Sequence, residues 1–130
     1  MRMRFIVLAL AAVALGAGVS AVAANARDTQ AGAVPVKITV TMGEYYFKLT
    51  KRSVAKQPGA SSVIVVFTVI NKGAIAHDFA FGSLGKKTAR LNAGQKQTLR
   101  VTFKKKGRYA YLCTVPRHAN AGMAGTFRVT

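Results

Sequence analysis

One cysteine, two histidines and one methionine are the residues of this chain best suited to bind a transition metal. Cys113 is the only cysteine, and four residues separate it from His118, as four more separate His118 from Met123. The only other histidine, His77, lies shortly after the most apolar strand-like run, residues 62–70. A thiolate and two imidazoles with a distant thioether form the ligand set of blue-copper electron-transfer sites. The spacing therefore predicts a copper site that uses every cysteine and every histidine of the chain.

Each of these residues also has a simpler interpretation when it is taken alone. A lone cysteine is usually a buried, inert hydrophobic residue. His77 precedes Phe79 and Phe81, which is consistent with a packed core side chain, and Met123 is consistent with core filling. Zinc is the nearest alternative metal, although methionine is not a usual zinc ligand. The four residues together, at this spacing, favour copper.

The composition argues against an enzyme. The chain has only three acidic residues, so no pair of carboxylates is expected for acid–base chemistry. One cysteine provides no dithiol couple. A nucleophile made of one cysteine and one histidine is conceivable, but it leaves the second histidine and Met123 without a role.

The first 26 residues have the pattern of a secretory signal peptide. Arg2 and Arg4 precede an apolar stretch, and small residues follow it. This stretch is shorter than the roughly 20 residues that span a bilayer, which favours cleavage over a membrane anchor. We therefore expect an exported protein, periplasmic or at the cell exterior, with residues 27–34 as a flexible lead-in. The single cysteine excludes an internal disulfide, so metal ligation would protect the thiol in an oxidising compartment.

The chain is strongly basic, with a formal charge of +17. Without Arg2 and Arg4, 18 of the 20 basic residues remain against three acids, a formal charge of +15. Such a charge steers association with acidic partners and weakens as salt screens it. Acidic redox proteins, anionic membranes and anionic cell-wall polymers all fit, as does simple solubility. Nucleic acid is disfavoured because the chain is expected to be exported.

Apolar residues alternate with polar ones from Pro35 onward, which is the pattern of strands rather than helices. A chain of 130 residues is one ordinary domain. We expect about eight strands, at residues 36–41, 44–49, 62–70, 77–81, 88–91, 97–103, 108–114 and 124–130, and a solvated loop at 51–60. The run at 62–70 is expected to be covered on both faces. The pattern predicts an all-β domain over residues 35–130, an antiparallel sandwich with Greek-key links.

A sandwich of this kind is able to bring the four metal-binding residues together. His77 and Cys113 are far apart in sequence, but each is expected where a strand meets a loop. Greek-key strands place such loops at one end of the sandwich. His118 and Met123 lie on the loop after Cys113, whereas His77 is expected to come from the facing sheet.

The segments 71–77 and 111–123 resemble those of the cupredoxins, the plastocyanin/azurin/rusticyanin group of small blue-copper proteins. The resemblance covers nearly all of residues 35–130. It implies one type 1 copper, with equatorial ligands at His77, Cys113 and His118 and a weak axial ligand at Met123. It also implies a monomeric carrier that passes single electrons between redox partners. His118, among small apolar residues, is expected to be the point where electrons enter and leave.

Two residues depart from the pattern of this group. Asp78 follows the first histidine where Asn or Ser is common, so its carboxylate either bonds backbone amides across the ligand loops or lowers the reduction potential. Arg117 stands where relatives often carry glycine, and it either pins an acidic partner or favours the reduced state. Two other functions remain open: a copper-binding module for storage, sensing or delivery, and a basic adhesion domain that needs no metal.

Overall fold

The structure is a computed structural model and describes residues 34–130. The expected signal peptide, at residues 1–26, and all of the expected lead-in except Val34 lie outside the described residues. No helix of the described part is long and apolar enough to cross a membrane.

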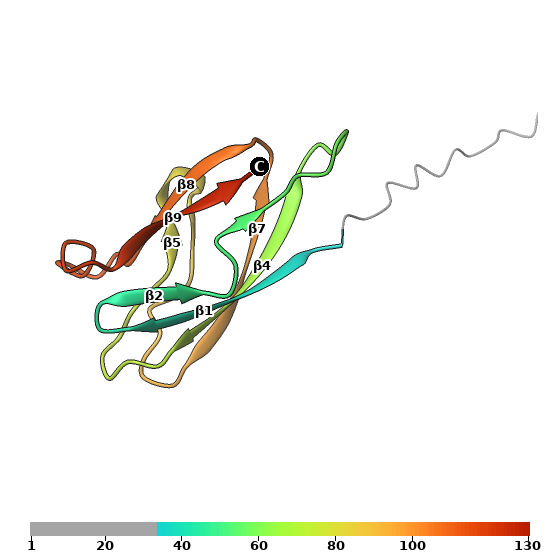
Figure 1. Ribbon diagram of the computed structural model, residues 1–130. Helices are drawn as coiled ribbons and strands as arrows, with labels where there is room; N and C mark the ends of the chain where they lie inside the picture. The colour runs from blue at the N-terminus through green and yellow to red at the C-terminus, as the bar shows by residue number, and fades with distance from the viewer. Residues whose placement is uncertain (1–33) are drawn as a thin grey trace, which may run out of the picture.

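Two β-sheets pack face to face and form a sandwich (Figure 1). The first sheet has the strand order β2 (Tyr46–Leu49), β1 (Val36–Gly43), β4 (Val63–Asn71) and β7 (Lys96–Phe103). The second has the order β3 (Ser53–Val54), β9 (Ala124–Val129), β8 (Gly107–Leu112), β5 (Ala80–Phe81) and β6 (Lys86–Lys87). The only helical element in residues 34–130 is a short 3-10 turn, Gly82–Leu84. The expected all-β sandwich is therefore confirmed.

Strand pairing is mixed rather than wholly antiparallel. β1 pairs with β2 in antiparallel fashion but with β4 in parallel, in a register that places Met42 opposite Asn71. β1 and β4 therefore end at the same end of the sandwich. The β1–β2 turn and the connection after β4 meet there, and Figure 1 shows them on the same side as the loop between β8 and β9.

The core is a layer of aromatic rings between the two sheets. Five phenylalanines are fully buried, namely Phe67, Phe79, Phe81, Phe103 and Phe127. Phe67 of β4 and Phe127 of β9 come from opposite sheets, and their ring centroids lie 5.4 Å apart in an edge-on arrangement. Contacts of this kind favour one arrangement of the layer. The two sheets are therefore packed tightly against each other through this layer.

The strands differ from those expected in burial and in extent, and the strand expected at 77–81 is regular only at β5, Ala80–Phe81. The expected cover on both faces of β4 is wrong, because its residues alternate between buried and half-buried along the strand. The 51–60 loop contains the short strand β3, which pairs in parallel with β9. Residues 88–91 form no regular strand.

A β-bulge explains the irregular segment at 88–91. Thr88 donates its N–H to the Phe79 carbonyl at 3.0 Å, while Leu91 and His77 exchange both of their backbone hydrogen bonds. The segment from Thr88 to Leu91 therefore pairs with the shorter segment from His77 to Phe79. The segment 88–91 has one residue more than its partner, and this extra residue forms the bulge. Bulges of this kind re-aim side chains and are frequent beside functional sites.

Candidate metal centre

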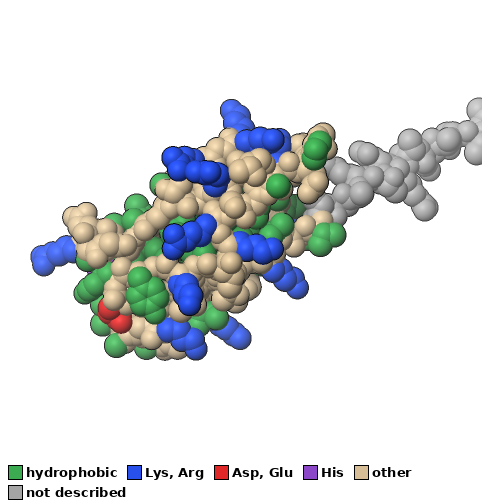
Figure 2. All heavy atoms as spheres, viewed as in Figure 1, with side chains coloured by type: hydrophobic (Ala, Val, Ile, Leu, Met, Phe, Trp, Pro, Cys, Tyr) green, Lys and Arg blue, Asp and Glu red, His purple; other side chains and the backbone are tan. Residues whose placement is uncertain are grey.

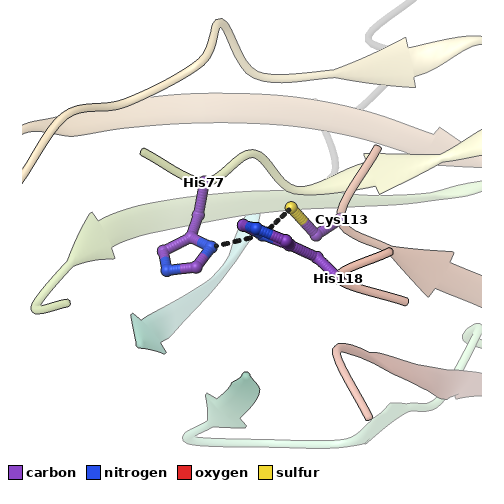
Figure 3. A group of neighbouring side chains, drawn as sticks. All are labelled: His77, Cys113 and His118. Atoms are coloured by element: carbon purple, nitrogen blue, oxygen red, sulfur yellow. Dashed lines mark hydrogen bonds between the residues drawn. The ribbon is translucent and has the colours of Figure 1, made fainter. Parts of the chain in front are cut away.

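His77, Cys113 and His118 converge at one end of the sandwich (Figure 3). Their ligand atoms all lie within 4.8 Å of one another. The Nδ1 atoms of the two histidines are 3.0 Å apart, and Cys113 Sγ is 3.6 Å from His118 Nδ1. One metal ion with bonds of roughly 2.0–2.3 Å can bridge atoms at such separations.

Burial keeps the three side chains away from water and shifts the pKa values of two of them, Cys113 and His118. His77 is fully buried, Cys113 is 1% exposed and His118 is 8% exposed. Burial raises the pKa of the Cys113 thiol above its ordinary value. Burial, and after it the neighbouring His77, lower the pKa of His118, so its neutral form is favoured. A neutral imidazole is ready to bind a metal, whereas the thiol must lose its proton first.

The chemistry of this donor set fits copper. A soft thiolate and imidazole nitrogens are the ligand types that copper prefers, and a weak axial thioether commonly completes such a site. Met123 is fully buried at the end of the same loop. Its carbonyl accepts the N–H of Cys113 at 3.1 Å, and its N–H bonds the carbonyl of His118 at 3.0 Å. These two bonds hold the loop that carries Cys113, His118 and Met123 in a closed shape.

The loop after Cys113 also contains an unusual backbone conformation at Arg117. Its φ of 70° lies in the left-handed region, which costs a residue with a side chain about 1–2 kcal/mol. Arg117 is exposed, and the N–H of Ala121 bonds its carbonyl at 3.1 Å. The conformation accounts for why glycine suits this position. Arginine at this position retains the backbone cost, and its exposed side chain adds no burial cost.

The position of His77 is fixed by hydrogen bonds from Asn71, earlier in the chain, and by pairing with Leu91, later in the chain. Asn71 is buried at the end of β4, and its amide donates to the carbonyls of Ile75 and Leu91, both at 2.8 Å. Its side-chain oxygen accepts the N–H of Gly73 at 2.8 Å. The pairing of His77 with Leu91 continues the β5–β6 ladder. The expectation that His77 comes from the facing sheet is therefore wrong, because β5 belongs to the sheet that carries β8 and Cys113.

Asp78 makes the cross-loop bonds that the sequence left as one of two alternatives. It is buried, and its Oδ1 accepts the N–H of Thr114 at 2.6 Å. The Thr114 hydroxyl donates to the other carboxylate oxygen. The carboxylate thus joins the segment of His77 to the segment of Cys113.

Two residues of the β1–β2 turn belong to the site, and sequence reasoning missed both. The Glu44 carboxylate accepts the N–H of Ile75 at 3.0 Å and lies 3.1 Å from Nε2 of His77. The Ile75 amide, and to a lesser degree His77, lower the pKa of Glu44. The Tyr45 ring stands edge-on to the His118 ring, with centroids 4.9 Å apart. The sequence signal that could have pointed to Glu44 is that it is one of only three acidic residues in the chain, whereas Tyr45 has no distinguishing signal.

The comparisons with known proteins agree with this site. The sequence matches a family model described as copper binding proteins, plastocyanin/azurin family, over residues 20–130. Comparison with curated protein sequences gives no significant match.

Several solved structures share the fold. Auracyanin from the photosynthetic bacterium Roseiflexus castenholzii is 21% identical, with a TM-score of 0.54 over 76% of this chain and 99% of that one. Auracyanin B is 22% identical, with a TM-score of 0.58 over 75% and 91%. The periplasmic domain of subunit II of cytochrome oxidase from Bradyrhizobium japonicum is 17% identical, with a TM-score of 0.54 over 73% and 83%. At these identities the likeness shows a common fold.

Proposed function

Because the chain belongs to the plastocyanin/azurin family of copper-binding proteins, we propose that it carries single electrons between redox partners. The site in this proposal is one type 1 copper with His77, Cys113 and His118 as equatorial ligands and Met123 as the weak axial ligand. The observation that supports it most strongly is the buried convergence of the first three side chains, with ligand atoms within 4.8 Å of one another. Copper bound there supplies a one-electron couple between its cuprous and cupric states.

The surrounding residues keep this site rigid and dry. The Asp78 bond to Thr114 and the backbone bonds of Met123 fix both ligand segments. The buried aromatic layer lies beneath them. A site that is held in one geometry changes little when an electron arrives or leaves, and this favours fast transfer. Hydrogen bonds around the ligands and exclusion of water also tune the reduction potential.

The surface above His118 suits brief contact with a partner. His118 itself is nearly covered, while Tyr45, whose ring stands edge-on to the His118 ring, is 42% exposed. In the proposal, electrons pass through the small exposed part of His118 and the Tyr45 ring that packs against it. A small apolar surface of this kind lets partners approach closely without binding tightly.

Positive charge around the site favours an acidic docking surface on the partner. Lys72 and Arg117 are exposed on the two ligand loops, and Arg90 is close enough to His118 to lower its pKa. Figure 2 shows lysines and arginines spread over the visible face as well. The wider charge also suits association with an anionic membrane or cell-wall surface. We propose that the protein acts as a monomer and has no catalytic role of its own.

Export is part of the same proposal. It rests on the signal-peptide pattern of residues 1–26, followed by the short lead-in and a copper-binding domain at 35–130. A periplasmic, extracellular or cell-surface location fits this pattern equally well.

A role in copper storage, sensing or delivery would use the same ligands and is the main alternative. A delivery protein must release its metal readily, yet the three proposed ligands are 0%, 1% and 8% exposed. The two roles are separated by repeated reduction and reoxidation of the copper-loaded protein in the presence of a strong copper chelator. An electron carrier keeps its copper through many cycles. Rapid loss of copper to the chelator would instead support delivery.

A further inference from the structure

Outside the proposed ligands, the side-chain ring of His77 has a carboxylate from another part of the chain as a hydrogen-bond partner. Glu44 Oε1 lies 3.1 Å from His77 Nε2, on the side of the ring opposite the atom that faces His118. From this geometry we propose that Glu44 is a positioning residue of the copper site, which fixes both the orientation and the tautomer of His77. The inference rests on the proposed role of His77 as a copper ligand.

The parallel pairing of β1 with β4 brings Glu44 to this place. Met42 lies opposite Asn71, and the N–H of Lys72 bonds the Met42 carbonyl at 2.8 Å. Glu44 follows two residues later and therefore stands beside the loop that leads to His77. The same carboxylate oxygen accepts the N–H of Ile75 at 3.0 Å. The carboxylate is thus anchored to the loop and does not depend on His77 alone for its position.

An ionised carboxylate can only accept hydrogen bonds, so its contact with Nε2 requires that nitrogen to carry the proton. A neutral His77 then has its lone pair on Nδ1, the atom that lies 3.0 Å from His118 Nδ1. A metal-binding histidine commonly donates its other ring N–H to a carboxylate or carbonyl, and this bond selects the metal-binding nitrogen. Glu44 supplies that bond here.

Gly73 leaves room for the carboxylate. A Cβ built at position 73 would overlap the Glu44 carboxylate and would lie 2.8 Å from its Cδ atom. The obstructing atoms are the end of a flexible side chain, so an alanine at 73 would displace Glu44 rather than the backbone. Gly73→Ala therefore breaks the contact while the negative charge stays in the molecule.

The charge distribution also singles out Glu44. Residues 34–130 contain two acids, and the other one, Asp78, is buried and bonded to Thr114. Glu44 has the one exposed side-chain carboxylate of this part of the chain, and this carboxylate contacts a proposed ligand, His77.

The test compares the full wild-type protein with Glu44→Ala, Glu44→Gln and Gly73→Ala. Nitrogen NMR of the copper-free protein at pH 8 reports which ring nitrogen of His77 carries the proton. We expect the Nε2–H form in the wild type and in Glu44→Gln, whose amide oxygen still accepts the bond. We expect a mixture of tautomers in Glu44→Ala and Gly73→Ala. Copper affinity should fall about 10–100-fold in these last two variants.

Lys72→Ala is the matched control, because it changes an exposed side chain of the same loop next to Gly73. It should leave the His77 tautomer and the copper affinity unchanged. Thermal unfolding checks that each variant is folded. Loss of the Glu44 charge in Glu44→Gln should also raise the reduction potential.

An unchanged His77 tautomer and unchanged copper affinity in folded Glu44→Ala would overturn the inference and leave Glu44 as a carboxylate that rests on the loop. The tautomer is read without copper, so this outcome is distinct from a failure of the electron-transfer proposal. That proposal fails if the wild type binds no copper or loses it on redox cycling.

Discussion

The carboxylate of Asp78 accepts the backbone N–H of Thr114 at 2.6 Å, and so connects the residue after His77 to the residue after Cys113. Two of the three converging side chains are 36 positions apart in the sequence. This hydrogen bond spans that separation directly. The geometry of the site therefore depends on a contact between residues that do not themselves face the proposed copper.

Asp78→Ala removes this connection and leaves the Thr114 amide without its acceptor. We expect the free energy of unfolding of the copper-free protein to fall by about 1–3 kcal/mol, the usual cost of a polar group left unsatisfied. Asp78→Asn should lose less, because an amide oxygen still accepts from Thr114 and the amide N–H can donate to its hydroxyl. Denaturant unfolding measures both variants. Equal stability of Asp78→Ala and the wild type would show that the carboxylate does not brace the loops.

Met123→Leu tests the weak axial ligand. The substitution nearly preserves the volume of a fully buried side chain, so it should cost less than about 1.5 kcal/mol of stability. We expect copper to remain bound and the reduction potential to rise, because a weak donor to the cupric state is lost. Copper content and voltammetry check this. Complete loss of copper would show that Met123 is a principal ligand.

Copper uptake should be linked to proton release from Cys113. Burial raises the pKa of this thiol, so it is still protonated at pH 8, whereas the lowered pKa of His118 leaves its imidazole neutral. Binding at pH 8 should therefore release about one proton per copper, and affinity should rise with pH as protons compete less well for sulfur. Calorimetry in buffers of different ionisation enthalpy measures the release. A value near zero would mean that the thiolate does not bind the metal.

Two substitutions at Arg117 separate the effect of its charge on electron transfer from the effect of its backbone conformation on stability. Its left-handed backbone suits glycine, so Arg117→Gly should cause no loss of stability. Arg117→Ala removes the same charge but retains the backbone penalty. Both variants should react more slowly with an anionic redox reagent, and the difference from wild type should shrink as salt is added. Stopped-flow rates with anionic and cationic reagents test this. An equal effect on both reagents would argue against steering by charge.

Much of the fold and the three converging side chains were accessible from sequence because their signals are local. Alternation of apolar residues predicts strands directly, and the spacing from Cys113 to Met123 lies within one loop. The cupredoxin resemblance is confirmed by the family match over residues 20–130 and by the auracyanin structures. Because the chain has only one cysteine and two histidines, few residues could serve as copper ligands.

The features that were missed depend on how strands pair across the sheets. The parallel register of β1 with β4 is not visible in either strand alone, and it is the reason that Glu44 and Tyr45 reach the site. The bulge at residues 88–91 likewise keeps the alternating pattern of a strand while breaking its ladder. The sheet that carries His77 was predicted wrongly for the same reason, since strand order cannot be read from local periodicity.

The visible absorption spectrum of the copper-loaded protein tests the central claim most directly, with Cys113→Ser as the control. Thiolate coordination to cupric ion predicts an intense visible band that ascorbate bleaches and reoxidation restores. The band should be absent from Cys113→Ser, whose hydroxyl cannot replace the thiolate. A wild-type protein that stays colourless and keeps a free, reactive thiol after exposure to cupric ion would contradict the account.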